Sequence, residues 1–360
     1  MYEIDIEYAD KDGIKRIEFD LEESVLDLSK KGIISINLGA LKNSPEIEEL
    51  LLGPNKLTEI DLTPLSELKS LRVVNLFKNQ LASVNLAPLE GCTDLRELNL
   101  GTNELDSVDL SPLSNCIQLE RLRLFNNKIT DIDLAPLSSC PNLVSLELET
   151  NGLESVNLVP LQNCRNLAQL NLMYNSLTEI DLEPLSACKN LKFLYLHQNA
   201  ISSIDLTPLS KAADFRILRL GGNELASIDL DPLAHCRNLR RLELAMNVIS
   251  ELDLTPLSTC VDLRALDIAG NQLESVDLTP LSECTALEEL YLYSNHPQEN
   301  DFSGLDLSPL FSCTELEDLG VPDSCELTAD VKLKTQKEKP FAIEELIDDG
   351  RISWRKSSVL

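Results

Sequence analysis

The stretch LRVVNLFKNQLASVNLAPLEGC, residues 71–92, is one copy of a unit that repeats through most of the chain. The next copy, LRELNLGTNELDSVDLSPLSNC, begins at Leu95, which is 24 residues after Leu71. Further copies begin at Leu119, Leu143, Leu167, Leu191, Phe215, Leu239, Leu263 and Leu287. A fixed period of this length is typical of arrays that grow by stacking one unit on the next. The 360 residues therefore predict one elongated array instead of several globular domains.

Each copy carries an inward-facing pattern followed by an asparagine. Val74 and Leu76 alternate with polar residues, which predicts a short strand with one buried face. Asn79 follows, and asparagine recurs at this position from Asn55 to Asn295 without a gap. Because a buried amide both donates to and accepts from backbone groups, stacked asparagines are predicted to close one continuous turn.

A proline marks the end of each copy. It stands at Pro88, and Ser111, Thr207, Thr255 or Thr279 precedes the equivalent proline in other copies. This order predicts a helix N-cap followed by proline at the first position of a short helical turn.

These residues carry a resemblance to a known family. The pattern L-x-x-L-x-L-x-x-N-x-L is complete in Leu95, Leu98, Leu100, Asn103 and Leu105. The chain resembles the leucine-rich repeat family, and its return segment I-D-L-x-P-L-x-x-C is similar to that of short-repeat intracellular members found in phosphatase regulatory subunits. The resemblance implies an α/β fold: a right-handed horseshoe solenoid with about 12–13 parallel strands on its concave face and short helical or 3-10 turns on its convex face. It also implies protein binding as the usual activity, without naming the partner.

The two ends of the chain depart from the period. Residues 1–20 contain two alternating runs around an Asp-Lys-Asp-Gly turn, which predicts a β-hairpin that caps the array. Residues 21–325 form the predicted solenoid. Residues 326–360 change in composition and hold the single tryptophan, Trp354, so they are predicted to act either as a C-terminal cap or as a docking tail.

The register breaks once within the array. Between Asn295 and Asp306 the segment HPQENDFSGL replaces a stretch that is five residues shorter in other copies. This insertion predicts a loop near Tyr291 and Tyr293.

Composition excludes several classes of function. The net charge of −29 argues against nonspecific attraction to nucleic acid or anionic lipid. The opening MYEIDIEYADKDG lacks the basic start and apolar run of a signal peptide, and no apolar stretch is long enough for a membrane span. We therefore expect a cytoplasmic monomer that binds neither nucleic acid nor membrane.

Nine of the ten cysteines hold one position of the repeat, where Ala212 and Leu68 also occur. A position that accepts Cys, Ala or Leu is a small apolar packing site, and no clustered C-x₂₋₄-C spacing of a metal site is present. Buried, reduced thiols are therefore expected. Cys325 lies outside this register, and it is the one cysteine that we expect to be exposed.

Large side chains occupy strand positions that the core does not use. Because side chains alternate along a strand, residues such as Glu97, Asn99 and Gly101 must point away from the core and form rows across the sheet. Six of the fifteen Phe, Tyr and Trp residues stand in these rows, which suggests anchors for a partner. An alternative is that aromatic residues are simply good strand formers. The candidate partner-binding residues are Phe77, Arg121, Arg123, Phe125, Met173, Tyr174, Phe193, Tyr195, His197, Arg219, Tyr291 and Tyr293.

Charge adds a second expectation for this surface. Between Arg72 and Asp267, eleven basic and six acidic residues stand on or beside the strands, so the inner surface is predicted to be near neutral or basic. The predicted partner has an acidic or mixed polar surface with an apolar spot. The alternative is local charge balance, such as Arg123 beside Glu147.

A row of Asp and Asn residues on the return segment, Asp61 and Asp109 among them, could bind calcium or could bond to nearby N–H groups of a turn. The absence of a glycine-rich calcium repeat favours turn bonding.

No nucleotide-binding, zinc-protease or nucleophile-elbow motif occurs, and the histidines are His197, His235 and His296. No Cys or Ser lies near His197 on the expected sheet, and Cys236, which follows His235, is a packing position. We therefore expect no catalytic site and no cofactor. The first hypothesis is a protein-binding scaffold centred on residues 167–220. The alternative is a regulatory subunit of an enzyme such as a phosphatase or small GTPase, and a metal-binding repeat protein is the least supported possibility.

Overall fold

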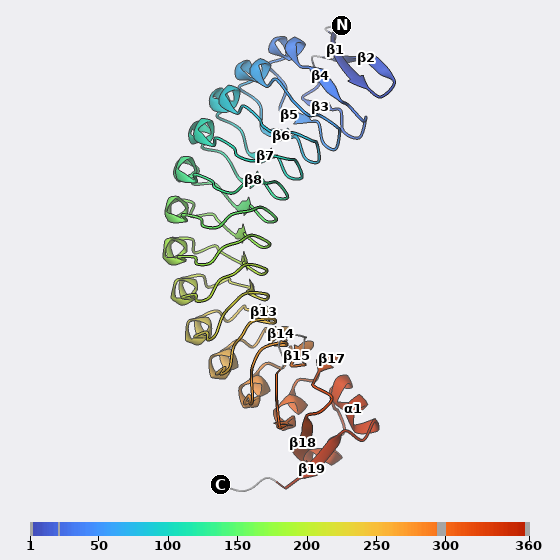
Figure 1. Cartoon of the computed structure of the whole chain (residues 1–360), viewed down its shortest axis with the longest axis vertical. Helices are drawn as coiled ribbons and strands as arrows, with labels where there is room; N and C mark the ends of the chain where they lie inside the picture. Colours follow the sequence, from blue (N-terminus) through green and yellow to red (C-terminus); the bar gives the residue numbers. More distant parts are fainter. Residues whose placement is uncertain (1–2, 21, 294–299, 357–360) are drawn as a thin grey trace. The chain divides into compact units, whose positions relative to one another are not determined.

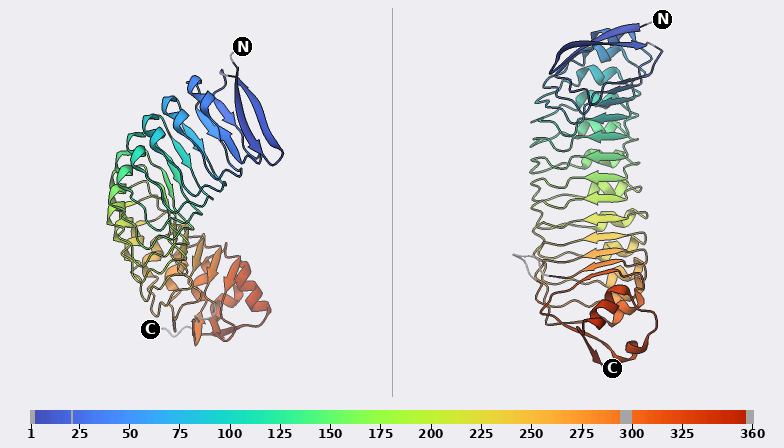
Figure 2. Two further views of the ribbon diagram at one scale, coloured as in Figure 1. Left: turned by 45° about the horizontal axis from the view of Figure 1, so that its top comes forward. Right: turned by 90° about the vertical axis from the view of Figure 1, so that its right-hand side faces the viewer.

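The computed structural model describes residues 3–20, 22–293 and 300–356 (Figure 1). The chain divides into two compact units, unit 1 with residues 1–176 and unit 2 with residues 177–360. In each unit, strands of three residues line one side and short 3-10 helices line the opposite side (Figure 2). No helix in the described ranges has the length and apolar character needed to cross a bilayer.

Unit 1 begins with a hairpin of two long strands. Strand β1 (Glu3–Asp10) pairs antiparallel with β2 (Gly13–Asp20) and, on its other side, with β4 (Ser35–Asn37). Ile6 and Phe19 lie buried beneath this small sheet, so the sheet shields apolar side chains at this end of unit 1.

The rest of unit 1 is a regular array. Its parallel strands are β3 (Val25–Asp27), β5 (Glu49–Leu51), β6 (Val73–Asn75), β7 (Glu97–Asn99), β8 (Arg121–Arg123), β9 (Ser145–Glu147) and β10 (Gln169–Asn171). Its 3-10 helices are η1 (Gly39–Asn43), η2 (Thr63–Glu67), η3 (Ala87–Gly91), η4 (Ser111–Asn115), η5 (Ala135–Ser139) and η6 (Val159–Asn163). Val74 pairs with Leu98, one period further along, and the other strands keep this register. The parallel strands and short 3-10 turns that the family resemblance implied are therefore confirmed.

Unit 2 continues the same plan. Its parallel strands are β11 (Phe193–Tyr195), β12 (Ile217–Arg219), β13 (Arg241–Glu243), β14 (Ala265–Asp267), β15 (Glu289–Tyr291) and β17 (Asp318–Gly320). Its 3-10 helices are η7 (Glu183–Ala187), η8 (Thr207–Lys211), η9 (Asp231–His235), η10 (Thr255–Thr259), η11 (Thr279–Glu283) and η12 (Ser308–Ser312).

The C-terminal part of unit 2 forms a second, smaller sheet. Strands β16 (Gly304–Asp306), β18 (Glu326–Asp330) and β19 (Ile352–Arg355) pair in parallel. Helices η13 (Val331–Thr335) and α1 (Phe341–Asp348) connect β18 to β19. The ring of Trp354 lies 6.2 Å from that of Phe311 in η12, so the tryptophan packs on the last repeat.

In the regular repeats, the turn after the strand is closed by the repeat's asparagine, as expected. Asn103 Oδ1 accepts the N–H of Leu81 at 3.1 Å, and Asn103 Nδ2 donates to the carbonyls of Leu76 and Leu100. Each amide thus joins its own repeat to the previous one, and satisfies backbone groups that have no strand partner.

The insertion changes which asparagine closes its turn. Asn295 lies outside the described residues, as do 296–299, so the predicted loop is described only from Asn300 onward. The turn bonds expected of Asn295 are made by Asn300, which donates to Leu292 and accepts from Leu273. Asn300 is eight residues after Leu292, whereas Asn103 is three after Leu100, so the five extra residues precede the asparagine.

The predicted N-cap role of Ser111, Thr207, Thr255 and Thr279 is wrong, because each of these residues is the first residue inside its 3-10 helix. The residue before it is a leucine without a capping side-chain bond, such as Leu206. The row of Asp and Asn residues supplies the bond instead: Asp205 Oδ1 accepts the N–H of Thr207 at 2.8 Å. This is the turn bonding that the sequence offered as the alternative to calcium.

All ten cysteines are free thiols and all are buried. Cys92 Sγ donates to the carbonyl of Leu65, 3.5 Å away, and equivalent bonds recur along the array. The expected exposure of Cys325 is wrong, since only 5% of the residue is accessible. Cys325 directly precedes β18, and its Sγ donates to the carbonyl of Glu326 at 3.7 Å.

Candidate protein-binding surface

The candidate surface consists of three outward positions in each repeat: the first and third residues of a strand, and the residue two positions after it. We call these positions the strand face. In β7 they are Glu97, Asn99 and Gly101. Because the strands are in register, equivalent positions line up across each unit.

Some residues of the strand face serve the fold. Asn75 Oδ1 accepts the N–H of Phe77 at 2.9 Å, and Asn99 and Asn171 make the same bond two residues further along. Asn99 is only 8% exposed. Asn75 therefore stabilises the end of its strand and serves the fold.

Two phenylalanines meet on the strand face of unit 1. The rings of Phe77 and Phe125 lie 5.8 Å apart with their planes tilted by 45°, although they belong to repeats that are not adjacent. Gly101 stands in the repeat between them, and a Cβ atom there would come within 2.5 Å of the Phe125 ring. The glycine makes room for the two rings to touch across it, and both remain half-buried.

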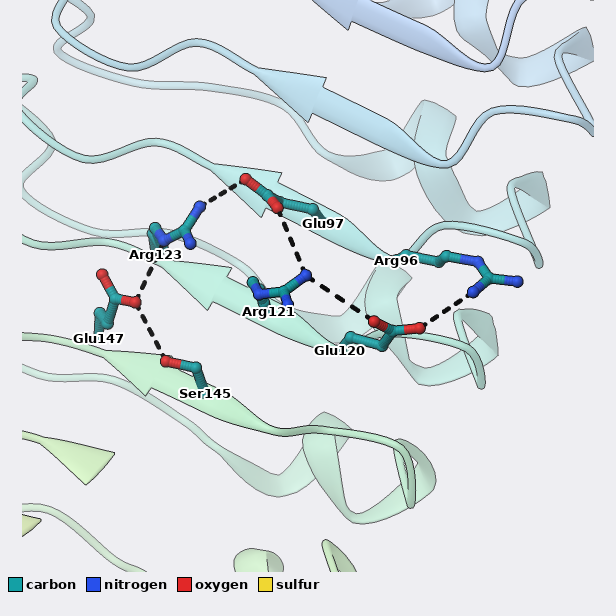
Figure 3. Close-up of polar contacts among 7 residues, drawn as sticks. All are labelled: Arg96, Glu97, Glu120, Arg121, Arg123, Ser145 and Glu147. Carbon is teal, nitrogen blue, oxygen red and sulfur yellow. Dashed lines mark hydrogen bonds and ion pairs between the residues drawn. The ribbon is translucent and has the colours of Figure 1, made fainter. Parts of the chain in front are cut away.

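Arg123 stands two residues before Phe125 and is held by two carboxylates (Figure 3). Its Nε is 3.1 Å from Glu147 Oε1, and its Nη1 contacts Glu97 Oε1. Ser145 Oγ also donates to Glu147, at 3.0 Å. The predicted pairing of Arg123 with Glu147 is thus present.

Arg121 belongs to the same network. It lies 3.9 Å from Glu97 and 3.8 Å from Glu120, and Glu120 also pairs with Arg96 at 3.1 Å (Figure 3). Across both units, seven of the eleven basic residues counted from the sequence form ion pairs: Arg72, Arg96, Arg121, Arg123, Arg219, Arg241 and Arg264. Local charge balance therefore accounts for most of the predicted basic excess.

Glu149 is the most unusual carboxyl group of unit 1. Its Oε2 atom is buried without a hydrogen-bond partner in the described chain. Its backbone lies beside the repeats of Phe125 and Met173, because the Asn126 N–H donates to the Glu149 carbonyl and the Thr150 N–H to that of Met173. Burial raises the pKa of Glu149 to about 7.

Met173 and Tyr174 are the last two candidate residues of unit 1. Met173 is half-buried on the strand face, whereas Tyr174 is 51% exposed and adopts a φ of 53°. The same turn position has positive φ in other repeats, where Gly222 and Gly270 also occupy it. Tyr174 therefore belongs to the turn and not to the strand face.

In unit 2, Phe193 and Tyr195 project from the same strand, β11. Their rings stack with centroids 6.4 Å apart and planes at 1°. The guanidinium of Arg219, on the next strand, lies 5.6 Å from the Tyr195 ring, and its Nε is 3.2 Å from Glu243. These four residues form one connected cluster on β11, β12 and β13.

His197 follows this cluster on the strand face and is half-buried. Burial, followed by the charge of Arg219, lowers the pKa of His197 to about 4. The imidazole is thus neutral near pH 7 and suits packing or hydrogen bonding better than charge pairing. His235 ends η9, and His296 lies outside the described residues.

A second aromatic pair lies at β15. The rings of Tyr291 and Tyr293 are 5.9 Å apart at 75°, and the Tyr291 hydroxyl donates to Asp318 at 2.7 Å. Gly320 leaves space for both rings, because a Cβ there would lie 2.5 Å from Tyr293.

The structure thus gathers the candidates into separate clusters. Phe77 joins Phe125, Arg121 joins Arg123 through Glu97, and the Phe193, Tyr195 and Arg219 cluster stands apart from Tyr291 and Tyr293. Met173 and Tyr174 belong to unit 1, whereas Phe193, Tyr195 and His197 belong to unit 2.

The charge count overlooked partners outside its window, namely Glu48, Glu288 and Glu289. The search for aromatic candidates overlooked the glycines beside the rings, Gly101 and Gly320. Glycine at a position where neighbouring repeats carry aromatic residues was the available signal.

Sequence comparison with family models matches most of the array. Leucine rich repeat models match residues 141–201, 165–225 and 214–273, and a two-copy Leucine Rich repeats model matches residues 117–163. A BspA type Leucine rich repeat region model with six copies matches residues 23–120. Comparison with curated protein sequences gives no significant match.

Solved structures of leucine-rich repeat proteins share the fold. An internalin, inlF, from Listeria monocytogenes has a TM-score of 0.68 and 26% identity, covering 84% of this chain and 87% of its own. A leucine-rich repeat protein from Leptospira interrogans has a TM-score of 0.75 and 21% identity, covering 91% of this chain and 83% of its own.

A third similar structure is the plant peptide hormone receptor RGFR1 in complex with RGF2, with a TM-score of 0.68 and 21% identity. The match covers 81% of this chain and 50% of the receptor chain. The repeated pattern, the parallel strands with short 3-10 turns and these matches show that the chain belongs to the leucine-rich repeat family.

Proposed function

We propose that this protein is a non-catalytic scaffold that binds a protein partner through its strand face. The leucine-rich repeat fold generally serves protein–protein interaction, and a plant receptor of similar fold is solved with a peptide hormone. The observation that carries the proposal is the presence of half-buried aromatic clusters on the strand face of both units. Rings held in place by their neighbours lose little freedom on binding, which makes them effective anchors.

The partner in this proposal has a mixed polar surface with an apolar spot. The ion pairs around Arg121, Arg123 and Arg219 support mixed polarity over a purely acidic partner, because most of the local charge is already balanced. We also propose a cytoplasmic location, supported by ten free and buried thiols in a chain without disulfides.

Binding assays with paired variants test the surface. We would capture partners with the full chain, then compare Phe193→Ala plus Tyr195→Ala and Phe77→Ala plus Phe125→Ala. The matched control is Ile117→Ala plus Val261→Ala, since both residues are exposed and lie beside the 3-10 helices. At least one aromatic pair is expected to weaken capture about tenfold or more, a loss typical of anchor residues. Equal capture by all variants would refute the proposal.

The alternative, a regulatory subunit for a phosphatase or small GTPase, uses the same surface. It predicts that the captured partner changes its rate of phosphate release or GTP hydrolysis when this chain binds. An unchanged rate at saturating binding would exclude the regulatory function and would be consistent with a scaffold.

A further inference from the structure

Strand β2 presents a long open edge. It has eight residues and forms the outer strand of its sheet, in the order β2-β1-β4. The other strands that end a sheet in the described chain have three or four residues. Alternate residues of β2 bond to β1, so the remaining N–H and C=O groups point outward, and no strand of the described chain pairs with them.

Several side chains of β2 are strongly exposed to solvent. Ile14 is 74% exposed, which is the largest value among the exposed large apolar residues of the described chain. Ile17 is half-buried. Arg16 pairs with Glu7 of β1 at 3.2 Å, but Glu18 lies opposite Asp5, another acid, and forms no ion pair in the described chain.

We infer that β2 pairs antiparallel with β2 of a second copy of this chain, centred on Ile17, and joins the two small sheets into one. In such a symmetric pair, residues that face each other must lie on the same side of the sheet. The two-fold axis therefore lies between the two copies of one central residue, which face each other. The choice of central residue decides which charges meet.

Among the four middle residues of β2, Lys15 to Glu18, only Ile17 satisfies the charges as the centre of the pair. A pair centred on Lys15, Arg16 or Glu18 places that residue opposite its own copy, which brings like charges together. A pair centred on Ile17 places Arg16 opposite Glu18 twice and packs Ile17 against its copy. Glu18 then gains the basic partner that its own hairpin does not supply.

The second copy is favoured over a different protein because the strand is complementary to itself. Its first half carries Lys15 and Arg16, and its second half carries Glu18 and Asp20. A contact formed by one strand pair is small, so the dimer is expected to dissociate in the micromolar range. This inference departs from the monomer expected from the sequence.

Reversal of the charge of Glu18 in the full chain tests the proposed pairing of the two β2 strands. Sedimentation velocity of the wild type should show the mass rising from the 40.0 kDa monomer toward twice that value with concentration. Glu18→Arg should weaken the dimer at least tenfold, because the introduced arginine meets Arg16 of the second copy. The same change places an arginine opposite Asp5, so it supports the hairpin of its own chain.

Two further samples fix the register. Arg16→Glu plus Glu18→Arg restores opposite charges and should regain the dimer. An equimolar mixture of Arg16→Glu and Glu18→Arg should dimerise more tightly than either variant alone. Glu22→Arg has the same charge change as Glu18→Arg, lies outside β2, and should dimerise like the wild type. A wild type that stays monomeric at about 200 μM, well above micromolar dissociation, or a Glu18→Arg variant that dimerises as tightly as the wild type, would overturn the inference.

Discussion

Asn103 shows how a single side chain holds neighbouring repeats together. Its amide makes bonds to Leu81, Leu76 and Leu100, and the residue is 8% exposed. Removing it would leave three buried backbone groups without partners, and water cannot easily replace the amide there.

We therefore predict that Asn103→Ala lowers the free energy of unfolding by about 2–4 kcal/mol. Urea titration followed by circular dichroism measures the change. Asn115→Ala is the control, because Asn115 is exposed at the end of η4 and should shift stability by less than about 0.5 kcal/mol. Similar losses in both variants would contradict a role for the buried amide.

Glu149 gives unit 1 a dependence on pH. Its pKa is raised from 4.5 to about 7 by burial, so the folded chain binds this proton more tightly than the unfolded chain. Stability from this group is present below pH 4.5 and is lost as pH rises toward 7.

Glu149→Gln should therefore become more stable relative to the wild type as pH rises from about 5 to about 8. The expected gain is about 1–2 kcal/mol, because the full shift is reduced by partial exposure. Urea titration of both proteins at the two pH values measures it, and comparison with the wild type cancels other groups such as Asp267, whose pKa burial also raises, to about 6. A difference that does not change with pH would count against the assignment.

At the scale of the element, the turn after most of the parallel strands contains a residue in the left-handed conformation. Thr150 has a φ of 55° at this position, where unit 2 has Gly222 and Gly270. A β-branched residue is costly in this region, whereas glycine is not.

We predict that Thr150→Gly raises the free energy of unfolding by about 0.5–1 kcal/mol. Thr130→Gly is the control, since Thr130 is also exposed but is not among the residues with positive φ, and it should be destabilising. Thermal melting of the two variants distinguishes the outcomes, and a lower melting temperature for Thr150→Gly would refute the turn argument.

Elements also determine which face is available for binding. The strand supplies two outward positions and the following turn a third, and asparagines at some of them bond to the backbone, as Asn75 does to Phe77. Aromatic pairs such as Phe77 with Phe125 and Tyr291 with Tyr293 have a glycine between or beside them, namely Gly101 and Gly320. Candidate anchors therefore depend on neighbouring repeats and not on one strand alone.

At the scale of the whole molecule, the cysteine row is inert by burial. Desolvation raises the pKa of Cys92 to about 11 and that of Cys116 to about 12. A thiol reacts as the thiolate, so these groups are both inaccessible and protonated at neutral pH.

We predict that a disulfide reagent modifies less than about one thiol equivalent per native chain, and that all ten thiols react in denaturant. The absorbance of the released thiolate measures both values. Rapid reaction of one native thiol would point to Cys325, the least regular of the ten in the repeat pattern, and would contradict its burial.

The sequence by itself determined the repeat, the parallel strands, the asparagine-closed turns and the burial of the nine cysteines that share one repeat position. Identical residues recur at one spacing, and the burial of Leu98 or the bonds of Asn103 depend only on that spacing. The candidate aromatic residues were also readable, since outward positions follow from strand alternation.

Only the tertiary structure decided which side chains meet. Arg241 pairs with Glu289, which is 48 residues further along the chain, and Asn300 closes the turn that the pattern assigned to Asn295. The edge of β2 became open because β1 pairs with β4 on its other side. These outcomes depend on side-chain conformation, on where inserted residues are accommodated and on pairing between distant segments, none of which a repeat pattern specifies.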